Sequence, residues 1–185
     1  MFIMPRPGDA LLIIDMQNDF LPGGALPVPG GNELIPLINK QATLGFTTVV
    51  ASRDWHPENH CSFIGSGGKW PPHCVKETNG AAFAPSLLLP PGTHILSKGT
   101  YPECESYSAF KDENGTSTGL EGSLRSYSIR RVFLCGVALD YCVKASALDS
   151  VKAGFETHLL PDLTRSIGKA MDTLEFLWGH DVRIE

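Results

Sequence analysis

Cys142 lies in a stretch of sequence that suits nucleophilic chemistry. The apolar run 132–135 predicts a buried strand that ends at Gly136, and apolar residues then recur with helical spacing over 143–151, with Asp140 at the start of the helix. Cys142 is therefore expected in the first turn of a helix, where unpaired backbone N–H groups and the helix dipole lower the pKa of a thiol. Most free cysteines are small buried hydrophobic residues, and this stretch alone favours that plainer interpretation.

Asp15 and Lys98 also follow predicted strands. Asp15 ends the apolar run 10–14, and Lys98 ends a short strand predicted over 94–97. Carboxyl ends of parallel strands share one edge of a sheet, so Asp15, Lys98 and Cys142 can converge there. Asp15 could accept the thiol proton while Lys98 holds the carboxylate and favours the thiolate. The alternatives are an Asp15 that caps a turn and a Lys98 that is a solvated surface residue.

A second group of side chains has the residue types of a metal site. Asp54 and His56 are two positions apart, so in extended chain they point the same way, and either His60 or His73 could join them. Carboxylate oxygen and imidazole nitrogen bind zinc, iron(II) and manganese, and spacing does not choose among these metals. A lone histidine in a loop is usually polar surface, but His73 follows a Trp-Pro-Pro turn that this explanation fits poorly.

The composition is that of a globular protein. The chain has 185 residues, 42% of them hydrophobic and 19% charged, which suits a single domain over 1–185. A net charge of −5 without a basic tract argues against nucleic acid and anionic membranes as partners. The five cysteines form no C-x-x-C pair, so we expect free thiols, a reducing compartment and a cytoplasmic location.

Strand and helix patterns alternate along the chain. They predict a three-layer α/β/α fold with a mostly parallel sheet of about six strands. Strands are expected over 10–14, 47–52, 94–97, 132–135, 155–160 and 182–184, and helices over 32–44, 120–126, the segment that carries Cys142, and 164–178. Pro161 and Asp162 are expected to end the fifth strand. One face of the last helix is expected to be apolar and carries Ile167, Met171, Leu174 and Trp178.

Five motifs follow one another over nearly the whole chain, at residues 14–20, 54–60, 70–74, 98–99 and 136–143. In this order they resemble the motifs of the nicotinamidases, a family of isochorismatase-like cysteine hydrolases. The D-x-Q-N-D-F motif alone indicates only the superfamily. The D-W-H and W-P-P-H-C motifs indicate the branch that contains a metal.

The resemblance implies roles for these residues. The residues that match the catalytic triad are Asp15, Lys98 and Cys142. Those that match the metal ligands are Asp54, His56 and His73, and His60 matches a position that is a ligand or lies near the metal in some members. One divalent ion is implied, with zinc preferred and iron or manganese as alternatives.

The resemblance also implies how a substrate would be held. Phe20, Trp70 and Tyr107 fall where the family packs aromatic side chains around a pyridine ring. Val137-Ala138 matches a cis peptide, which would aim the backbone N–H groups of Ala138 and Cys142 at one oxyanion. The implied reaction is hydrolysis of nicotinamide to nicotinate and ammonia through a thioester, as part of NAD salvage.

Two other functions remain open from the sequence. One is a related hydrolase that acts on another amide or carbamoyl substrate with the same triad and no metal. The other is a metal-binding scaffold without catalysis. The sequence leaves open whether the chain forms a homo-oligomer, and the polar stretch from Asp112 to Thr118 is expected to be solvated loop.

Overall fold

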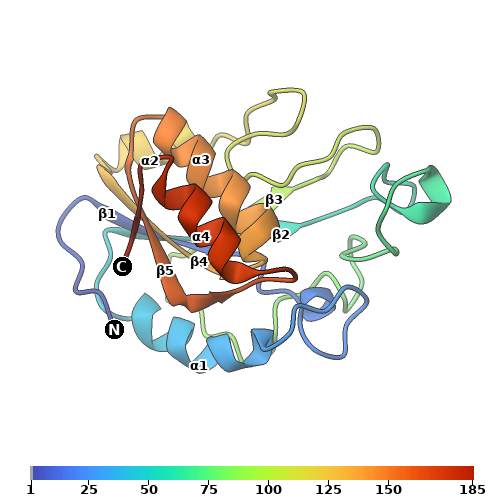
Figure 1. Cartoon of the computed structure of the whole chain (residues 1–185), viewed down its shortest axis with the longest axis horizontal. Helices are drawn as coiled ribbons and strands as arrows, with labels where there is room; N and C mark the ends of the chain where they lie inside the picture. The colour runs from blue at the N-terminus through green and yellow to red at the C-terminus, as the bar shows by residue number, and fades with distance from the viewer. Residues whose placement is uncertain (1) are drawn as a thin grey trace.

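A computed structural model describes residues 2–185 as a sheet covered by helices on both sides (Figure 1). The strands are β1 (Asp9–Ile14), β2 (Thr48–Asp54), β3 (His94–Lys98), β4 (Arg131–Val137), β5 (Glu156–Arg165) and β6 (Val182–Ile184). The α-helices are α1 (Gly31–Ala42), α2 (Leu120–Ser126), α3 (Lys144–Lys152) and α4 (Ala170–Trp178). Short helical turns are η1 (Asn18–Phe20), η2 (Ile64–Ser66) and the π-helical η3 (Leu139–Val143).

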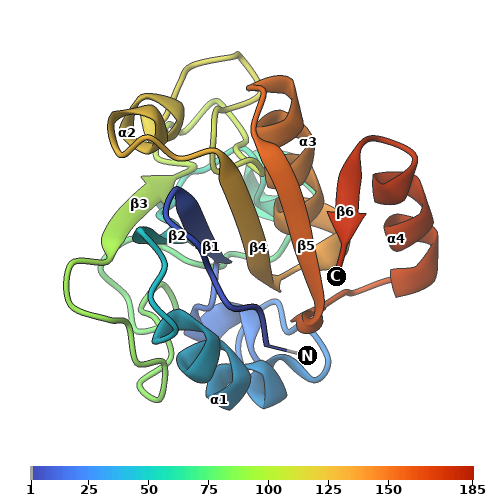
Figure 2. The same cartoon turned by 90° about the vertical axis from the view of Figure 1, so that its left-hand side faces the viewer.

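The six strands form one sheet in the order β3-β2-β1-β4-β5-β6, and every neighbouring pair is parallel (Figure 2). Helix α1 covers one face, while α2, α3 and α4 lie on the other side (Figure 1). The predicted three-layer α/β/α fold is thus confirmed, and the sheet is entirely parallel. From β1 to β3 the strands are added toward one edge of the sheet, and from β4 to β6 toward the other edge, so the order of addition reverses between β1 and β4. Ligand sites of such folds form at the carboxyl ends of the two strands on either side of this point.

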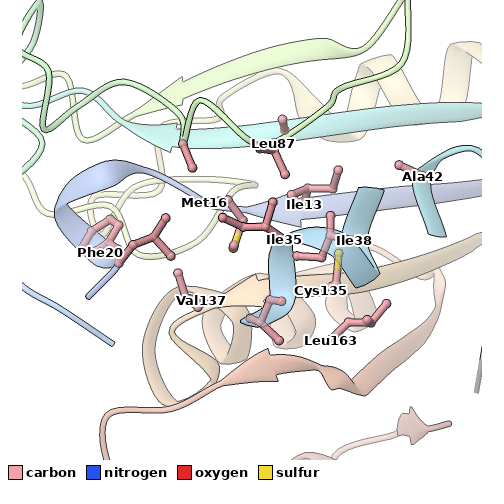
Figure 3. Packing of buried hydrophobic residues seen from close by; sticks show 14 of the residues in the cluster. Ile13, Met16, Phe20, Ile35, Ile38, Ala42, Leu87, Cys135, Val137 and Leu163 are labelled. Carbon is pink, nitrogen blue, oxygen red and sulfur yellow. The ribbon is translucent and has the colours of Figure 1, made fainter. Parts of the chain in front are cut away.

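Alternating residues of the central strands fill two cores. In β1, Leu11 and Ile13 belong to the core under α1, whereas Leu12 and Ile14 belong to the core under α2 and α3. Figure 3 shows Ile35 and Ile38 of α1 packed near Ile13 and Cys135. Both faces of β1 are buried, which explains its uninterrupted apolar sequence.

Strand β4 continues through Gly136, which was expected to end it. Gly136 has φ +108°, and a Cβ atom there would lie 2.1 Å from the carbonyl oxygen of Ile14 in β1. Glycine is therefore required by the close approach of β1 and β4, and it does not stop the strand. The peptide between Val137 and Ala138 is cis, as the resemblance implied.

Strand β5 also runs further than expected, because Pro161 and Asp162 lie inside it. The pairing with β4 shifts there: Leu134 pairs with Leu159, but Gly136 pairs with Thr164. The additional residues of β5 form an irregularity in the ladder, where a proline costs no hydrogen bond.

The last helix differs most from its prediction. It begins at Ala170, since Thr164 and Arg165 belong to β5. Met171 and Trp178, expected on the buried face, are 62% and 68% exposed, and the residues buried in α4 are Thr173 and Leu177. No helix within residues 2–185 is long and apolar enough to cross a membrane.

Candidate active site

A cleft opens at the carboxyl ends of β1 and β4, where the strand order predicts a ligand site. The space between its walls measures about 390 Å³, including space that is open to solvent. Its aromatic lining consists of Phe20, Trp70, Tyr107 and Tyr141. Ala138 and Cys142 also line it, together with Asp54, His73 and Glu105. An apolar cleft with a few polar groups suits a small aromatic ligand.

The structure brings Asp15, Lys98 and Cys142 together in the interior. Lys98 Nζ lies 2.9 Å from Asp15 Oδ2 and 3.4 Å from Cys142 Sγ. The side chains of Asp15 and Lys98 are completely buried, and Cys142 is 6% exposed. A candidate nucleophile, a candidate base and a cation that contacts both are therefore in direct reach of one another.

Asp15 is held in an unusual backbone conformation. Its φ is +50°, which a residue other than glycine adopts rarely. Its N–H donates to the carbonyl of Ser52 in β2, and the Ser52 hydroxyl donates to Asp15 Oδ1 at 2.6 Å. Oδ2 contacts the Lys98 ammonium but accepts no well-formed hydrogen bond from residues 2–185. This oxygen is consequently the one able to accept a further proton.

Burial sets the protonation of the cysteine and of its candidate base. It raises the pKa of the Cys142 thiol well above its usual value, and the attraction of Lys98 only partly opposes this. Burial also raises the pKa of Asp15, again against the effect of Lys98. The expectation that a helix start lowers the thiol pKa is therefore wrong for this site. Cys142 lies in the π-helical η3, and Asp140 accepts hydrogen bonds from the N–H groups of Ile167 and Gly168.

Asp54 connects this group to the histidines. Its Oδ1 lies 2.5 Å from Lys98 Nζ, and its Oδ2 lies 3.4 Å from His56 Nε2. Burial alone would raise the pKa of Asp54, but Lys98 and His56 hold it well below its usual range. Gln17 fixes the backbone at this point: its amide donates to the Asp54 carbonyl and accepts from the Asp54 N–H, both at 2.7 Å.

Asp54, His56 and His73 are arranged so that they could hold a metal ion. One ligand atom from each lies within 4.8 Å of the others. His56 and His73 pair Nδ1 at 2.8 Å with the carbonyls of Gly99 and Pro71, so each would bind an ion through its Nε2. A Cβ atom at Gly99 would lie 2.4 Å from His56 Cε1, so a side chain there would displace the His56 ring. This donor set fits a divalent ion with mixed nitrogen and oxygen ligands.

His60 is placed differently from the other two histidines. Its Nε2 faces the carbonyl of Cys104 at 3.1 Å, while Nδ1 pairs with the Ser62 hydroxyl at 2.8 Å and also receives the Ser62 N–H. Both ring nitrogens are thus occupied, and burial lowers the pKa of His60 to about 4. A neutral ring of this kind supports His56 by stacking, with centroids 3.9 Å apart.

Sequence reasoning missed several residues of this site. Glu105 lines the cleft and lies within 4.8 Å of ligand atoms of His56 and His60. Tyr141 packs edge-on against Trp70, whose Nε1 donates to the Tyr107 hydroxyl at 3.1 Å. The position of Tyr141 beside Cys142 was an available signal. Glu105 lies in an irregular loop whose path the sequence does not indicate.

The fold and the cleft define an α/β protein with a buried cysteine beside an aromatic cleft. A model of the isochorismatase domain matches residues 9–176, so the chain belongs to the isochorismatase family. It is 40% identical over 175 residues to the nicotinamidase of Acinetobacter baylyi, an alignment that covers 85% of this chain and 81% of that protein.

Two solved structures are also similar. One is PnC1 from L. infantum in complex with nicotinate, with 44% identity, a TM-score of 0.96, and coverage of 100% of this chain and 96% of that one. The other is the pyrazinamidase of Pyrococcus horikoshii in complex with zinc, with 45% identity, a TM-score of 0.89, and coverage of 97% and 99%.

Proposed function

We propose that this protein is a nicotinamidase that hydrolyses nicotinamide to nicotinate and ammonia and thereby serves NAD salvage. The observation that carries the proposal is the position of Lys98 Nζ, 2.9 Å from Asp15 and 3.4 Å from Cys142 beside an aromatic cleft. The nicotinamidase relative and the similar structure with bound nicotinate support the choice of substrate.

Acylation begins from a protonated thiol, since burial raises the pKa of Cys142. The sulfur attacks the carboxamide carbon as the thiol proton moves to Asp15 Oδ2, so that a C–S bond forms and the carbonyl electrons become an oxyanion. Asp15 suits this role because burial raises its pKa above the ordinary value of an aspartate, which makes it a better proton acceptor. Lys98 stays charged, since the carboxylates of Asp15 and Asp54 outweigh the effect of burial on its pKa.

The oxyanion would be held by the backbone N–H groups of Ala138 and Cys142, two residues that line the cleft. Loss of one such donor typically lowers the rate by on the order of 10²–10³. When the tetrahedral adduct collapses, the C–N bond breaks and Asp15 returns its proton to the departing nitrogen, which leaves as ammonia.

Deacylation reverses these roles with water as the nucleophile. Asp15 takes a proton from water as the oxygen attacks the thioester, the C–S bond breaks, and the proton returns to the Cys142 sulfur. Asp54, His56 and His73 would hold a divalent ion, with zinc preferred and iron or manganese as alternatives. Such an ion, when bound, supplies Lewis acidity and orients ligands beside the acyl group.

The test is ammonia release from nicotinamide, with metal content measured on the same sample before and after chelation. We expect release that falls with the metal and returns when zinc, iron or manganese is added. Cys142→Ala should lower the rate by on the order of 10⁴ or more. Cys135→Ala is the matched control, since Cys135 is a buried thiol of β4 in the core under α1.

Two results would contradict the proposal. Substantial turnover by Cys142→Ala would refute the thioester. No release from the metal-loaded protein would favour a related hydrolase with another amide or carbamoyl substrate, or a protein without catalytic activity.

A further inference from the structure

Lys69 places its ammonium group against the aromatic wall of the cleft. Its Nζ lies 4.7 Å from the ring centroid of Trp70, 5.2 Å from that of Tyr141 and 5.7 Å from that of Tyr107. All three rings line the cleft, whereas the Lys69 side chain is exposed and does not. A cation within about 6 Å of an aromatic face is attracted by the electrons of the ring.

The three rings come from segments that are far apart in the sequence. Trp70 belongs to the long connection between β2 and β3, Tyr107 to the connection between β3 and α2, and Tyr141 to η3 beside Cys142. The rings of Trp70 and Tyr107 each contact that of Tyr141, with centroids 5.2 and 5.8 Å apart. One ammonium group therefore interacts with a ring from each segment that forms the wall.

The backbone on both sides of Lys69 is anchored. The N–H of Gly68 donates to the carbonyl of Phe63 at 2.9 Å, and the N–H of Trp70 donates to that of Ser62 at 3.0 Å. Phe63 is buried in the structure. The main chain thus presents Lys69 toward the rings from a hydrogen-bonded turn.

We propose that Lys69 is a positioning residue that holds Trp70, Tyr107 and Tyr141 in the arrangement that receives an aromatic carboxamide. The inference rests on the proposed function and deepens it, because it assigns substrate affinity to a residue outside the cleft. Without the charge, the three rings lose their shared partner and must be ordered when the ligand binds, which weakens binding. The chemical step is unaffected, since Asp15, Lys98 and Cys142 contact one another and not Lys69.

The experiment compares Lys69→Met, which keeps the length of the side chain but removes its charge, with Lys69→Arg, which keeps the charge. Lys40→Met is the matched control, because Lys40 also lies over an aromatic ring at 4.3 Å, but that ring belongs to Phe2, which does not line the cleft. Steady-state kinetics on nicotinamide give KM and kcat, and titration calorimetry gives the Kd of nicotinate for each metal-loaded protein.

For Lys69→Met we expect KM and the nicotinate Kd to rise about threefold to tenfold, or about 0.6–1.4 kcal/mol, with kcat within twofold of wild type. Lys69→Arg and Lys40→Met should stay within twofold in all three quantities. Unchanged KM and Kd in Lys69→Met, an equal loss in Lys69→Arg, or a loss confined to kcat would overturn the inference alone. A wild-type protein that releases no ammonia would overturn the proposed function, and the inference with it.

Discussion

Lys98 Nζ lies 2.5 Å from Asp54 Oδ1, while the other oxygen of the same carboxylate faces His56 Nε2 at 3.4 Å. One buried carboxylate thus belongs both to the group around Cys142 and to the candidate metal site. The two groups share an electrostatic environment, because Asp54 acts on the pKa of Cys142 as well as on those of the histidines.

Asp54→Asn should make Cys142 more reactive toward alkylating agents in the metal-free protein. The Asp54 charge helps to raise the pKa of Cys142, so its removal lowers that pKa and increases the thiolate fraction at fixed pH. We expect alkylation about threefold to tenfold faster at pH 8, where tenfold corresponds to one pKa unit. Iodoacetamide labelling with peptide mapping measures the rate. His73→Asn is the control, and it should weaken metal binding without this increase; an equal rate in all three proteins would contradict the prediction.

Lys98→Met should destabilise the fold, because it leaves the carboxylates of Asp15 and Asp54 buried without their cation. Removing one partner of a buried ion pair costs about 3–5 kcal/mol. Lys98 lowers the pKa of both carboxylates, so without it the already raised pKa of Asp15 rises further and that of Asp54 rises from below its usual range. Ionised carboxylates then cost more in the folded state, so the loss should be larger at pH 8 than at pH 5. Urea unfolding of chelated protein at both pH values measures this. A loss of similar size at both would show that packing, and not charge, is responsible.

Zinc should stabilise the wild-type protein, and His73 should matter more for this than His60. A ligand at 100 times its Kd adds about 2.7 kcal/mol, which raises the Tm of a chain of this size by about 5–10 °C. His73→Asn should abolish most of this shift, since His73 has a free Nε2 beside Asp54 and His56. His60→Asn should retain at least half, because both ring nitrogens of His60 have partners within the protein. Thermal scans with and without zinc measure the Tm shift of each variant. Equal losses of this shift in His73→Asn and His60→Asn would identify His60 as a ligand.

Gly136→Ala should be strongly destabilising, by about 3 kcal/mol or more. Its Cβ would lie 2.1 Å from the Ile14 carbonyl oxygen, and the residue has φ +108°. Gly154→Ala is the matched control, because Gly154 has φ +83° but no atom within 4 Å of the added Cβ. We expect about 1–2 kcal/mol there from backbone strain alone. Denaturant unfolding of both variants measures the difference, and equal losses would mean that the strands separate to accommodate the methyl group.

The sequence predicted the central strands and the edge of the sheet that carries the site. The short run 10–14 is apolar throughout and lies between Gly8 and Asp15, as expected for a strand buried on both faces. Parallel pairing then directs Asp15, Asp54 and Lys98 to one edge, since each lies at or just after the carboxyl end of its strand. These conclusions follow from short-range pattern and from the geometry of parallel sheets.

The tertiary structure decided the relationships between segments that are distant in the sequence. The sequence associated Asp54 with the histidines alone, but the pairing of β2 with β3 sets Asp54 opposite Lys98. The path of the irregular loops placed Glu105 in the cleft and Lys69 behind its aromatic wall. The start of α4 depended on the shifted pairing of β5 with β4. Local propensity cannot encode such contacts, because their energies exist only once two remote parts of the chain have met.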